Sequence, residues 1–228
     1  MVRRCFDITA AAVGLILLTP VLTVAAAGIR LSSPGPVLYR ANRIGRSGVP
    51  FTMLKLRTMH CRTVSGSSIT AAGDSRVFPF GRILRALKID ELPQLVNVLR
   101  GDMAIVGPRP EAADIVAQYY TEEFCRTLLV RPGLTSPGSL DYYEHGEQFL
   151  AEVGAEEFYA TQLLPAKMAL DIPYLERATL RSDLVIIVRT IAVLSRRALR
   201  RSQPVRAAEP RLPETTSEAS RSRTSRAA

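Results

Sequence analysis

The hydrophobic pattern divides the chain into an apolar N-terminal segment, a mixed central region and a polar end. No charged residue occurs from Ile8 to Ile29. As one helix this stretch would be about 33 Å long, enough to cross a bilayer. Beyond Gln203 almost no residue could be buried, which predicts a disordered tail. We therefore expect a membrane segment, a globular domain and a tail, with the bounds 1–31, 32–201 and 202–228.

The charges on either side of the apolar segment bear on its topology. Arg3 and Arg4 precede it and Arg30 follows it, and positive charge at both ends favours two cytoplasmic ends. Pro20 removes a backbone donor near the middle, so a kink is expected. A helix that enters the membrane, breaks at Thr19 and Pro20 and returns on the same side satisfies both features. On this segment alone, a membrane-spanning anchor and a cleaved secretory signal remain as alternatives.

The central region predicts an α+β fold that is predominantly helical. Residues 32–58 combine turn residues with short apolar runs and read as strands of a small sheet. The Gly/Ser/Thr-rich stretch 60–75 reads as a mobile loop. Asp90 stands where a helix N-cap would stand. Helices are expected at 80–87, at 92–100, from near Glu111 and Thr121, and at 156–163, 166–177 and 180–200.

The last of these helices has an apolar stripe and a set of arginines. Two readings are open: a helix whose stripe faces the core and whose charged rim is solvated, or an amphipathic interfacial helix on anionic lipid. The stripe consists of Leu184, Ile187, Val188, Ile191 and Leu194.

Composition limits the partners and the kind of metal. The 228 residues suffice for one domain with a core, and a net charge of +9 favours anionic partners. Three widely spaced cysteines offer no disulfide framework, which fits a reducing compartment. The two histidines lie far apart with no cysteine nearby, which argues against a zinc site. Any metal should be a hard cation held by carboxylates.

Candidate chemistry is concentrated between Asp74 and Glu111. Cationic residues precede and follow the adjacent carboxylates Asp90 and Glu91, an arrangement suited to a phosphate ester and a divalent metal. Each motif also has a plainer reading: an N-cap for Asp90, a solvated face for the arginines and a rigid turn for residues 107–110. The cations are Arg76, Arg82, Arg85, Lys88, Arg100 and Arg109.

Taken together, these motifs resemble the signature block of the bacterial sugar transferases, the monotopic phosphoglycosyl transferases. The resemblance covers about residues 3 to 200 in the family's order. It rests on Arg4–Asp7, Ser33–Val37, Lys55–Met59, Lys88–Leu95, Asn97–Met103, Val106–Glu111 and Arg131–Thr135.

The resemblance implies a re-entrant helix broken at Thr19 and Pro20 and a catalytic domain on the cytoplasmic face of the bacterial inner membrane. It implies transfer of a phosphosugar from a UDP-sugar to polyprenyl (undecaprenyl) phosphate, with release of UMP, by a ping-pong mechanism. Asp90 would be the nucleophile that carries the phosphosugar, and Glu91 would bind Mg²⁺.

By the same matching, Arg85 would orient Asp90. The implied substrate contacts are Lys55, Arg57, Arg109, Arg131 and, as a weaker candidate, Asp171. Residues 135–145 depart from the family's usual pattern, so recognition of the sugar and of uridine does not follow from the resemblance. The sugar and the pathway stay undetermined, and a homodimer stays open.

Two other functions compete with this enzyme. One is a non-catalytic, membrane-tethered assembly protein of polysaccharide export, against which the intact Asp90, Glu91, Arg85 and Arg109 argue. The other is an exported protein that binds nucleic acid through its arginines. No nucleic-acid-binding motif occurs and few aromatic residues lie between the basic ones, so we expect no nucleic-acid partner.

Overall fold

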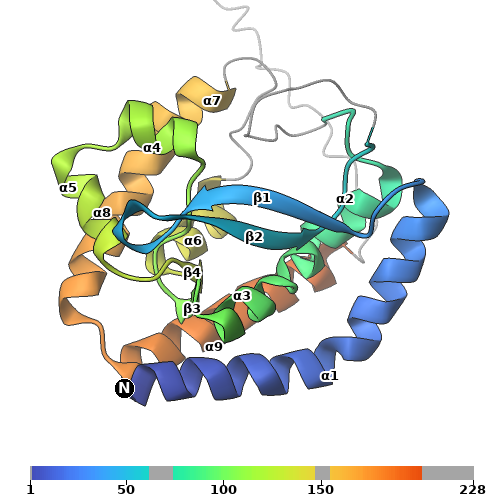
Figure 1. The fold of residues 1–228 in the computed structure, drawn as a ribbon, viewed down its shortest axis with the longest axis horizontal. Helices are drawn as coiled ribbons and strands as arrows, with labels where there is room; N and C mark the ends of the chain where they lie inside the picture. The colour runs from blue at the N-terminus through green and yellow to red at the C-terminus, as the bar shows by residue number, and fades with distance from the viewer. Residues whose placement is uncertain (1, 62–73, 147–154, 202–228) are drawn as a thin grey trace, which may run out of the picture.

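The computed structural model describes residues 2–61, 74–146 and 155–201. It is mostly helical with two small sheets, which agrees with the predicted α+β class (Figure 1). The predicted tail at 202–228 and most of the predicted loop at 60–75 lie outside the described residues. The longer helices are α1 (Val2–Ser32), α2 (Pro79–Ala86), α3 (Gln94–Arg100), α4 (Ala113–Tyr119), α8 (Leu164–Arg177) and α9 (Leu180–Arg201).

The remaining elements are short. The strands are β1 (Leu38–Ile44), β2 (Pro50–Leu56), β3 (Ala104–Val106) and β4 (Gly133–Thr135). The short helices are α5 (Glu122–Cys125), α6 (Pro137–Asp141) and α7 (Ala155–Phe158), with 3-10 turns η1 (Arg46–Gly48), η2 (Ile89–Glu91) and η3 (Arg126–Leu129). Two π-helical turns are η4 (Tyr142–Gly146) and η6 (Tyr159–Leu163).

The two sheets place the central segments of the chain. Strands β1 and β2 form an antiparallel hairpin in which Leu38 pairs with Leu56 and Ile44 with Pro50. Strands β3 and β4 are parallel and are brought together by a pair of glycines. A Cβ atom added to Gly133 would lie 2.1 Å from the amide nitrogen of Gly107, so a side chain at this position would separate the strands.

Helix α1 wraps around one side of the domain. Figure 1 shows it running along the lower edge and then turning to continue beside α2. Pro20 lies inside the helix, and Thr19 donates its hydroxyl hydrogen to the carbonyl oxygen of Leu15 at 2.7 Å. A proline interrupts the backbone hydrogen bonds of a helix, which is the physical cause of such a bend.

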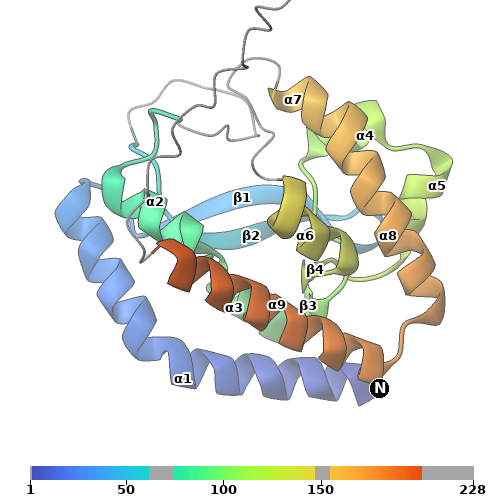
Figure 2. The ribbon, with the colours of Figure 1, turned by 180° about the vertical axis from the view of Figure 1, so that it is seen from behind.

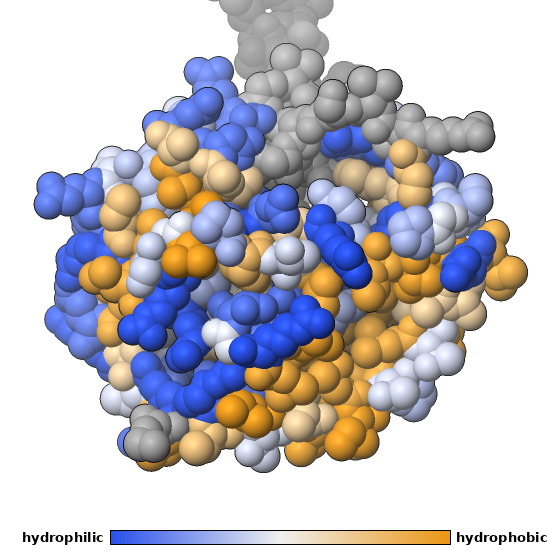
Figure 3. Space-filling model, viewed as in Figure 1, coloured by the Kyte–Doolittle hydropathy of each residue, from blue (hydrophilic) through white to orange (hydrophobic). Residues whose placement is uncertain are grey.

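Both halves of α1 pack on the domain. In the first half, Ala11 packs with Val98 of α3 and with Met103. In the second half, Ala25 and Ile29 pack in a cluster with Phe78 and with Leu84 of α2. The outer face is apolar and exposed, with Ile16 exposed to 73% and Leu17 to 70%. Figure 3 shows apolar surface gathered at the lower right of the molecule, where α1 lies in Figure 1.

Helix α9 lies across the back of the domain (Figure 2). The buried residues of this helix include Ile186 and Val193, which are not part of the predicted apolar stripe. Three residues of that stripe, Leu184, Val188 and Ile191, are exposed. The reading in which the stripe faces the core is therefore wrong for these three residues. Helix α9 has one apolar face against the domain and a second that no described residue covers.

Candidate active site

Asp90 and Glu91 lie on a short turn between two helices. Helix α2 ends at Ala86, and Lys88 then adopts a left-handed conformation with φ 56°. This conformation costs an L-residue roughly 1–2 kcal/mol. It reverses the chain into η2, so that both carboxylates are placed inside the molecule, each less than a tenth exposed. Strained backbone of this kind often marks functional positions.

Asp90 is not a helix cap. The N-cap of α3 is Pro93, which corrects the plainer reading of the sequence. The Oδ1 atom of Asp90 is buried and has no hydrogen-bond partner among the described residues. A buried carboxylate oxygen without a donor is costly, so a functional reason for it is expected. Two other buried atoms in the described chain share this property, the Nε of Arg43 and the Nε2 of Gln94.

In Glu91, by contrast, both carboxylate oxygens accept a hydrogen bond. Arg109 donates from Nη2 to Oε1 at 2.6 Å and from Nη1 to Oε2 at 3.1 Å. The ammonium of Lys55, on β2, lies 3.8 Å from Oε1. Arg109 follows β3 directly after the close contact between Gly107 and Gly133, which fixes where its backbone runs. Lys55 and Arg109 therefore meet at the predicted carboxylate pair.

The two carboxylates differ in pKa because their partners differ. Burial and the neighbouring charge of Glu91 raise the pKa of Asp90 to about 6. Burial also acts to raise the pKa of Glu91, but Arg109 and Lys55 outweigh it and hold that pKa well below its ordinary value. Burial lowers the pKa of Lys55 to about 8. Near pH 7 both carboxylates are therefore ionised, and of the two, Asp90 is the one with an oxygen that accepts no hydrogen bond from the described residues.

Arg85 and Lys88 act on Asp90 through their charge. Both favour its ionised form and oppose the rise in its pKa. No hydrogen bond or ion pair joins Arg85 to Asp90 in the described part of the chain. This charge interaction supports the predicted orienting role of Arg85. A direct contact between Arg85 and Asp90 stays a prediction.

Arg57 lies elsewhere in the structure. Its guanidinium donates to the carbonyl oxygens of Ser33, at 2.7 Å, and of Pro36, at 2.6 Å, and to the hydroxyl of Ser33 at 2.9 Å. It also lies over the ring of Phe78. These bonds tie the segment after α1 to β2. A phosphate contact by Arg57 stays a prediction, and it would require some of these bonds to be given up.

Arg131 and Asp171 also lie apart from the carboxylate pair. The Nε of Arg131 donates to the carbonyl oxygen of Gly101 at 2.8 Å. Asp171, on α8, accepts from the backbone of Gly138 at 2.8 Å and from the hydroxyl of Ser136 at 3.0 Å, so it holds the start of α6. Their predicted substrate contacts stay predictions.

Sequence reasoning missed two groups next to the site. Tyr143, 3% exposed, accepts a hydrogen bond from Arg109, and its ring lies beneath the ammonium of Lys88. Glu111, two residues after Arg109, forms a buried ion pair with Lys167 of α8 at 2.8 Å. Glu111 belongs to the motif Val106–Glu111 and could have been predicted from it. Nothing in the spacing of Tyr143 or Lys167 connects them with Arg109.

The site offers few protein ligands for a metal. Among the described residues, no group of three or more His, Cys, Asp and Glu side chains is arranged to hold an ion. Asp90 and Glu91 contribute carboxylate oxygens, and the Oδ1 of Asp90 has no competing donor. This set fits a hard cation that the protein shares with a phosphorylated substrate, because Mg²⁺ usually keeps waters and phosphate oxygens in its shell.

The chain is similar to known proteins over most of its length. The sequence model of the family described as "Bacterial sugar transferase" matches residues 1–197. Over 197 residues the chain is 43% identical to the UDP-glucose:undecaprenyl-phosphate glucose-1-phosphate transferase of Caulobacter vibrioides. The aligned region covers 84% of this chain and 69% of that protein.

Two further relatives come from other bacteria. The UDP-N-acetylgalactosamine-undecaprenyl-phosphate N-acetylgalactosaminephosphotransferase of Aeromonas hydrophila is 34% identical, over 85% of this chain and 43% of its own length. The exopolysaccharide production protein ExoY of Rhizobium meliloti is 33% identical, over 84% of each chain. With a family match that spans most of its length and relatives of this similarity, the chain belongs to the bacterial sugar transferase family.

Proposed function

We propose that this protein transfers a phosphosugar from a UDP-sugar to polyprenyl phosphate, giving polyprenyl-diphosphate-sugar and UMP. The relatives named above include transferases for UDP-glucose and for UDP-N-acetylgalactosamine that act on undecaprenyl phosphate. The observation that carries the proposal is the buried Oδ1 of Asp90, which has no hydrogen-bond donor in the described part of the chain, beside a Glu91 that is paired with Arg109. The reaction would initiate assembly of a polysaccharide or glycoconjugate.

The reaction has two steps. In the first, a carboxylate oxygen of Asp90 attacks the β-phosphorus of the UDP-sugar, the bond to the α-phosphate oxygen breaks, and UMP leaves with the electron pair. In the second, a phosphate oxygen of the lipid attacks the same phosphorus, the bond to Asp90 breaks, and the carboxylate is regenerated. No other reactant is needed.

The surrounding cations stabilise the ionised forms of Asp90 and Glu91. Lys55, Lys88 and Arg85 favour the ionised form of Asp90, which the attack requires. Arg109 and Lys55 keep Glu91 ionised. We propose that Glu91 would hold Mg²⁺, which would neutralise charge on the diphosphate and on the leaving UMP. Glu91 could keep Arg109 as a partner, since each carboxylate oxygen has two lone pairs.

We further propose that α1 enters the membrane and returns on the same side. The N-terminal end is tied to the domain because Arg4 donates to the carbonyl oxygens of Val98, at 2.7 Å, and Leu99, at 3.1 Å. The C-terminal end is tied to the same domain by the bonds between Arg57 and Ser33. A straight helix of 31 residues would separate its ends by about 45 Å and could not keep both attachments across a bilayer.

The apolar middle of α1 fits the membrane-embedded part of this arrangement. Among the described residues, α1 is the helix that is long and apolar enough to cross a bilayer. Only 11% of its most apolar 18-residue stretch is buried in the domain. Long apolar helices with exposed faces indicate membrane association. We therefore assign the domain to the cytoplasmic face of the bacterial inner membrane, with the exposed apolar face of α9 lying at the lipid surface.

The test is an activity panel. Purified protein with Mg²⁺ and polyprenyl phosphate should release UMP from at least one UDP-sugar, and Asp90→Asn should release none above background. Persistence of full UMP release in Asp90→Asn would refute the assignment of the nucleophile. Absence of turnover with every donor would favour the non-catalytic assembly protein instead.

A further inference from the structure

We infer that Tyr143 is a positioning residue for this reaction, holding the two cations Arg109 and Lys88 beside the carboxylates Asp90 and Glu91. The inference rests on the proposed function and extends it. Tyr143 lies on η4. It is 3% exposed, so the side chain is part of the interior of the domain.

The hydroxyl of Tyr143 engages Arg109. The Nη1 atom of Arg109 donates to this oxygen at 3.2 Å and to Oε2 of Glu91 at 3.1 Å. One guanidinium nitrogen is therefore shared between the carboxylate and the phenol. A planar guanidinium held by two partners has little freedom to rotate, so its orientation toward an incoming phosphate is set before the substrate binds.

The ring of Tyr143 engages Lys88. The ammonium nitrogen lies 4.5 Å from the ring centroid, within the range of a cation–π interaction. Lys88 is also the residue in the left-handed conformation that turns the chain toward Asp90. The aromatic face thus stabilises both the position of a cation and the strained backbone that carries it.

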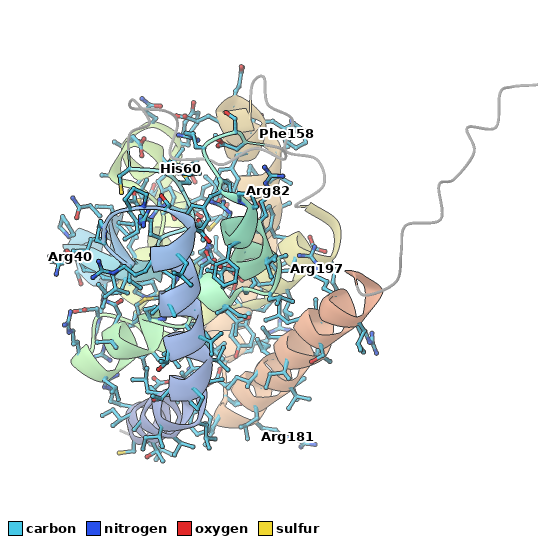
Figure 4. The ribbon with its side chains drawn as sticks, turned by 90° about the vertical axis from the view of Figure 1, so that its right-hand side faces the viewer. Arg40, His60, Arg82, Phe158, Arg181 and Arg197 are labelled. Atoms are coloured by element: carbon cyan, nitrogen blue, oxygen red, sulfur yellow. The ribbon has the colours of Figure 1, made fainter. Side chains whose placement is uncertain are left out.

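Helix α9 supports Tyr143 from the other side. Its ring packs in a cluster with Ile186 and Val193, and Arg197 donates to its backbone carbonyl oxygen. In Figure 4, Arg197 lies between α9 and the end of α6. Tyr143 therefore connects a helix with an exposed apolar face to the cations of the site. The same side chain could not position two cations if it were free to change rotamer, and this packing prevents that.

Two substitutions separate the hydroxyl from the ring. Tyr143→Phe removes the hydroxyl and keeps the ring over Lys88, and Tyr143→Leu removes both. With the UDP-sugar that the wild-type protein uses, we expect Tyr143→Phe to slow single-turnover UMP release about tenfold, as for a lost hydrogen bond to a charged group. Tyr143→Leu should lose about another threefold. Tyr119→Phe on α4 is the matched control and should retain the wild-type rate.

A double-mutant cycle distinguishes positioning from general stability. If the hydroxyl acts through Arg109, Tyr143→Phe should slow UMP release less than about twofold further in an Arg109→Lys background. A tenfold effect that persists unchanged in that background would mean that the hydroxyl does not act through Arg109, and would overturn the inference. The thermal unfolding midpoint of each variant is measured together with its rate of UMP release. A loss of rate that parallels a fall in the midpoint would also overturn the inference.

The outcomes also separate this inference from the proposed function. If Asp90→Asn is inactive while Tyr143→Phe matches the wild type, the nucleophile assignment stands and the role of Tyr143 is refuted. If Asp90→Asn keeps releasing UMP, the proposed function fails, and the inference that rests on it fails as well. Tenfold slower UMP release by Tyr143→Phe, together with an inactive Asp90→Asn variant, supports both the proposed function and the role of Tyr143.

Discussion

At the scale of single residues, two adjacent carboxylates take different roles because their surroundings differ. Glu91 is held by a bidentate guanidinium and a nearby ammonium, so it stays ionised. Asp90 is buried to a similar extent, but no residue that the structure describes donates a hydrogen bond to its Oδ1. Pairs of titratable groups whose environments push their pKa values apart are typical of catalytic sites. Here the group with the higher pKa is the one with a free oxygen.

The pKa of Asp90 predicts a pH dependence of the first step. Because this pKa is raised to about 6, the carboxylate becomes protonated below that pH and can no longer attack. Single-turnover release of UMP should be nearly constant above pH 7 and about tenfold slower at pH 5. The rate is measured by rapid quench between pH 5 and 8.

Two results bear on this prediction. The Tyr119→Phe variant should give the same profile as the wild type, because it leaves the carboxylate pair intact. A rate that stayed constant down to pH 5 would show that no group with this pKa has to be ionised for UMP release.

The sequence was sufficient for part of the site. Asp90 and Glu91 could be predicted because they belong to one contiguous motif, and Arg109 because it lies in another. Tyr143 could not, since its contact with Arg109 joins segments 34 residues apart and depends on how α6 and η4 fold. The hydrogen bonds made by Arg57 could not be predicted either, because a sequence does not distinguish an arginine that binds backbone carbonyl oxygens from one that binds phosphate.

At the scale of elements, a buried ion pair fixes the segment that carries Arg109. Lys167 of α8 bonds Glu111 at 2.8 Å, and the hydroxyl of Tyr159 donates to the same carboxylate. Burial opposes the ionisation of Glu111, but Lys167 and Tyr159 outweigh it and keep its pKa below the ordinary value. Helix α8 therefore holds the chain two residues after Arg109.

Removing one partner of this pair should be strongly destabilising. Lys167→Met leaves a buried carboxylate without its cation, which costs about 3–5 kcal/mol. For a protein of this size, the unfolding midpoint should fall by roughly 10 °C. The midpoint is measured in detergent by near-UV circular dichroism.

The matched double variant tests the cause. Lys167→Met combined with Glu111→Gln removes both charges and should recover most of the lost midpoint. The role of the ion pair would be contradicted by a Lys167→Met midpoint within about 2 °C of the wild type, or by a double variant as unstable as the single one.

The elements themselves were only partly predictable. Helices α2 and α3 lie within one or two residues of the expected bounds, because Pro79 and Gly101 limit them locally. For α9 the helix was expected but its buried face was not. Its apolar residues cover most of the circumference, so periodicity could not choose between the face that meets the domain and the face left exposed.

At the scale of the whole molecule, the attachment of both ends of α1 to one domain predicts the membrane topology. Cys5 near the N-terminus and Cys125 on α5 are both exposed and can report on it. In variants that keep one of these cysteines, a membrane-impermeant maleimide should label both from the cytoplasmic side of inverted vesicles.

A membrane-spanning α1 predicts a different labelling pattern. It would place Cys5 and Cys125 on opposite sides, so labelling of Cys125 alone in inverted vesicles would contradict the re-entrant arrangement. The Cys125 variant serves as the control for vesicle orientation, and solubilised protein serves as the control for reactivity.

The proposed reaction depends on Asp90 forming a covalent bond to the transferred phosphosugar. Purified protein is mixed with its UDP-sugar and Mg²⁺ in the absence of polyprenyl phosphate, quenched, digested and analysed by mass spectrometry. We expect a burst of UMP that approaches one per active site and a phosphosugar adduct on the peptide containing Asp90. No UMP burst without the lipid acceptor, or an adduct on a different residue, would contradict the mechanism.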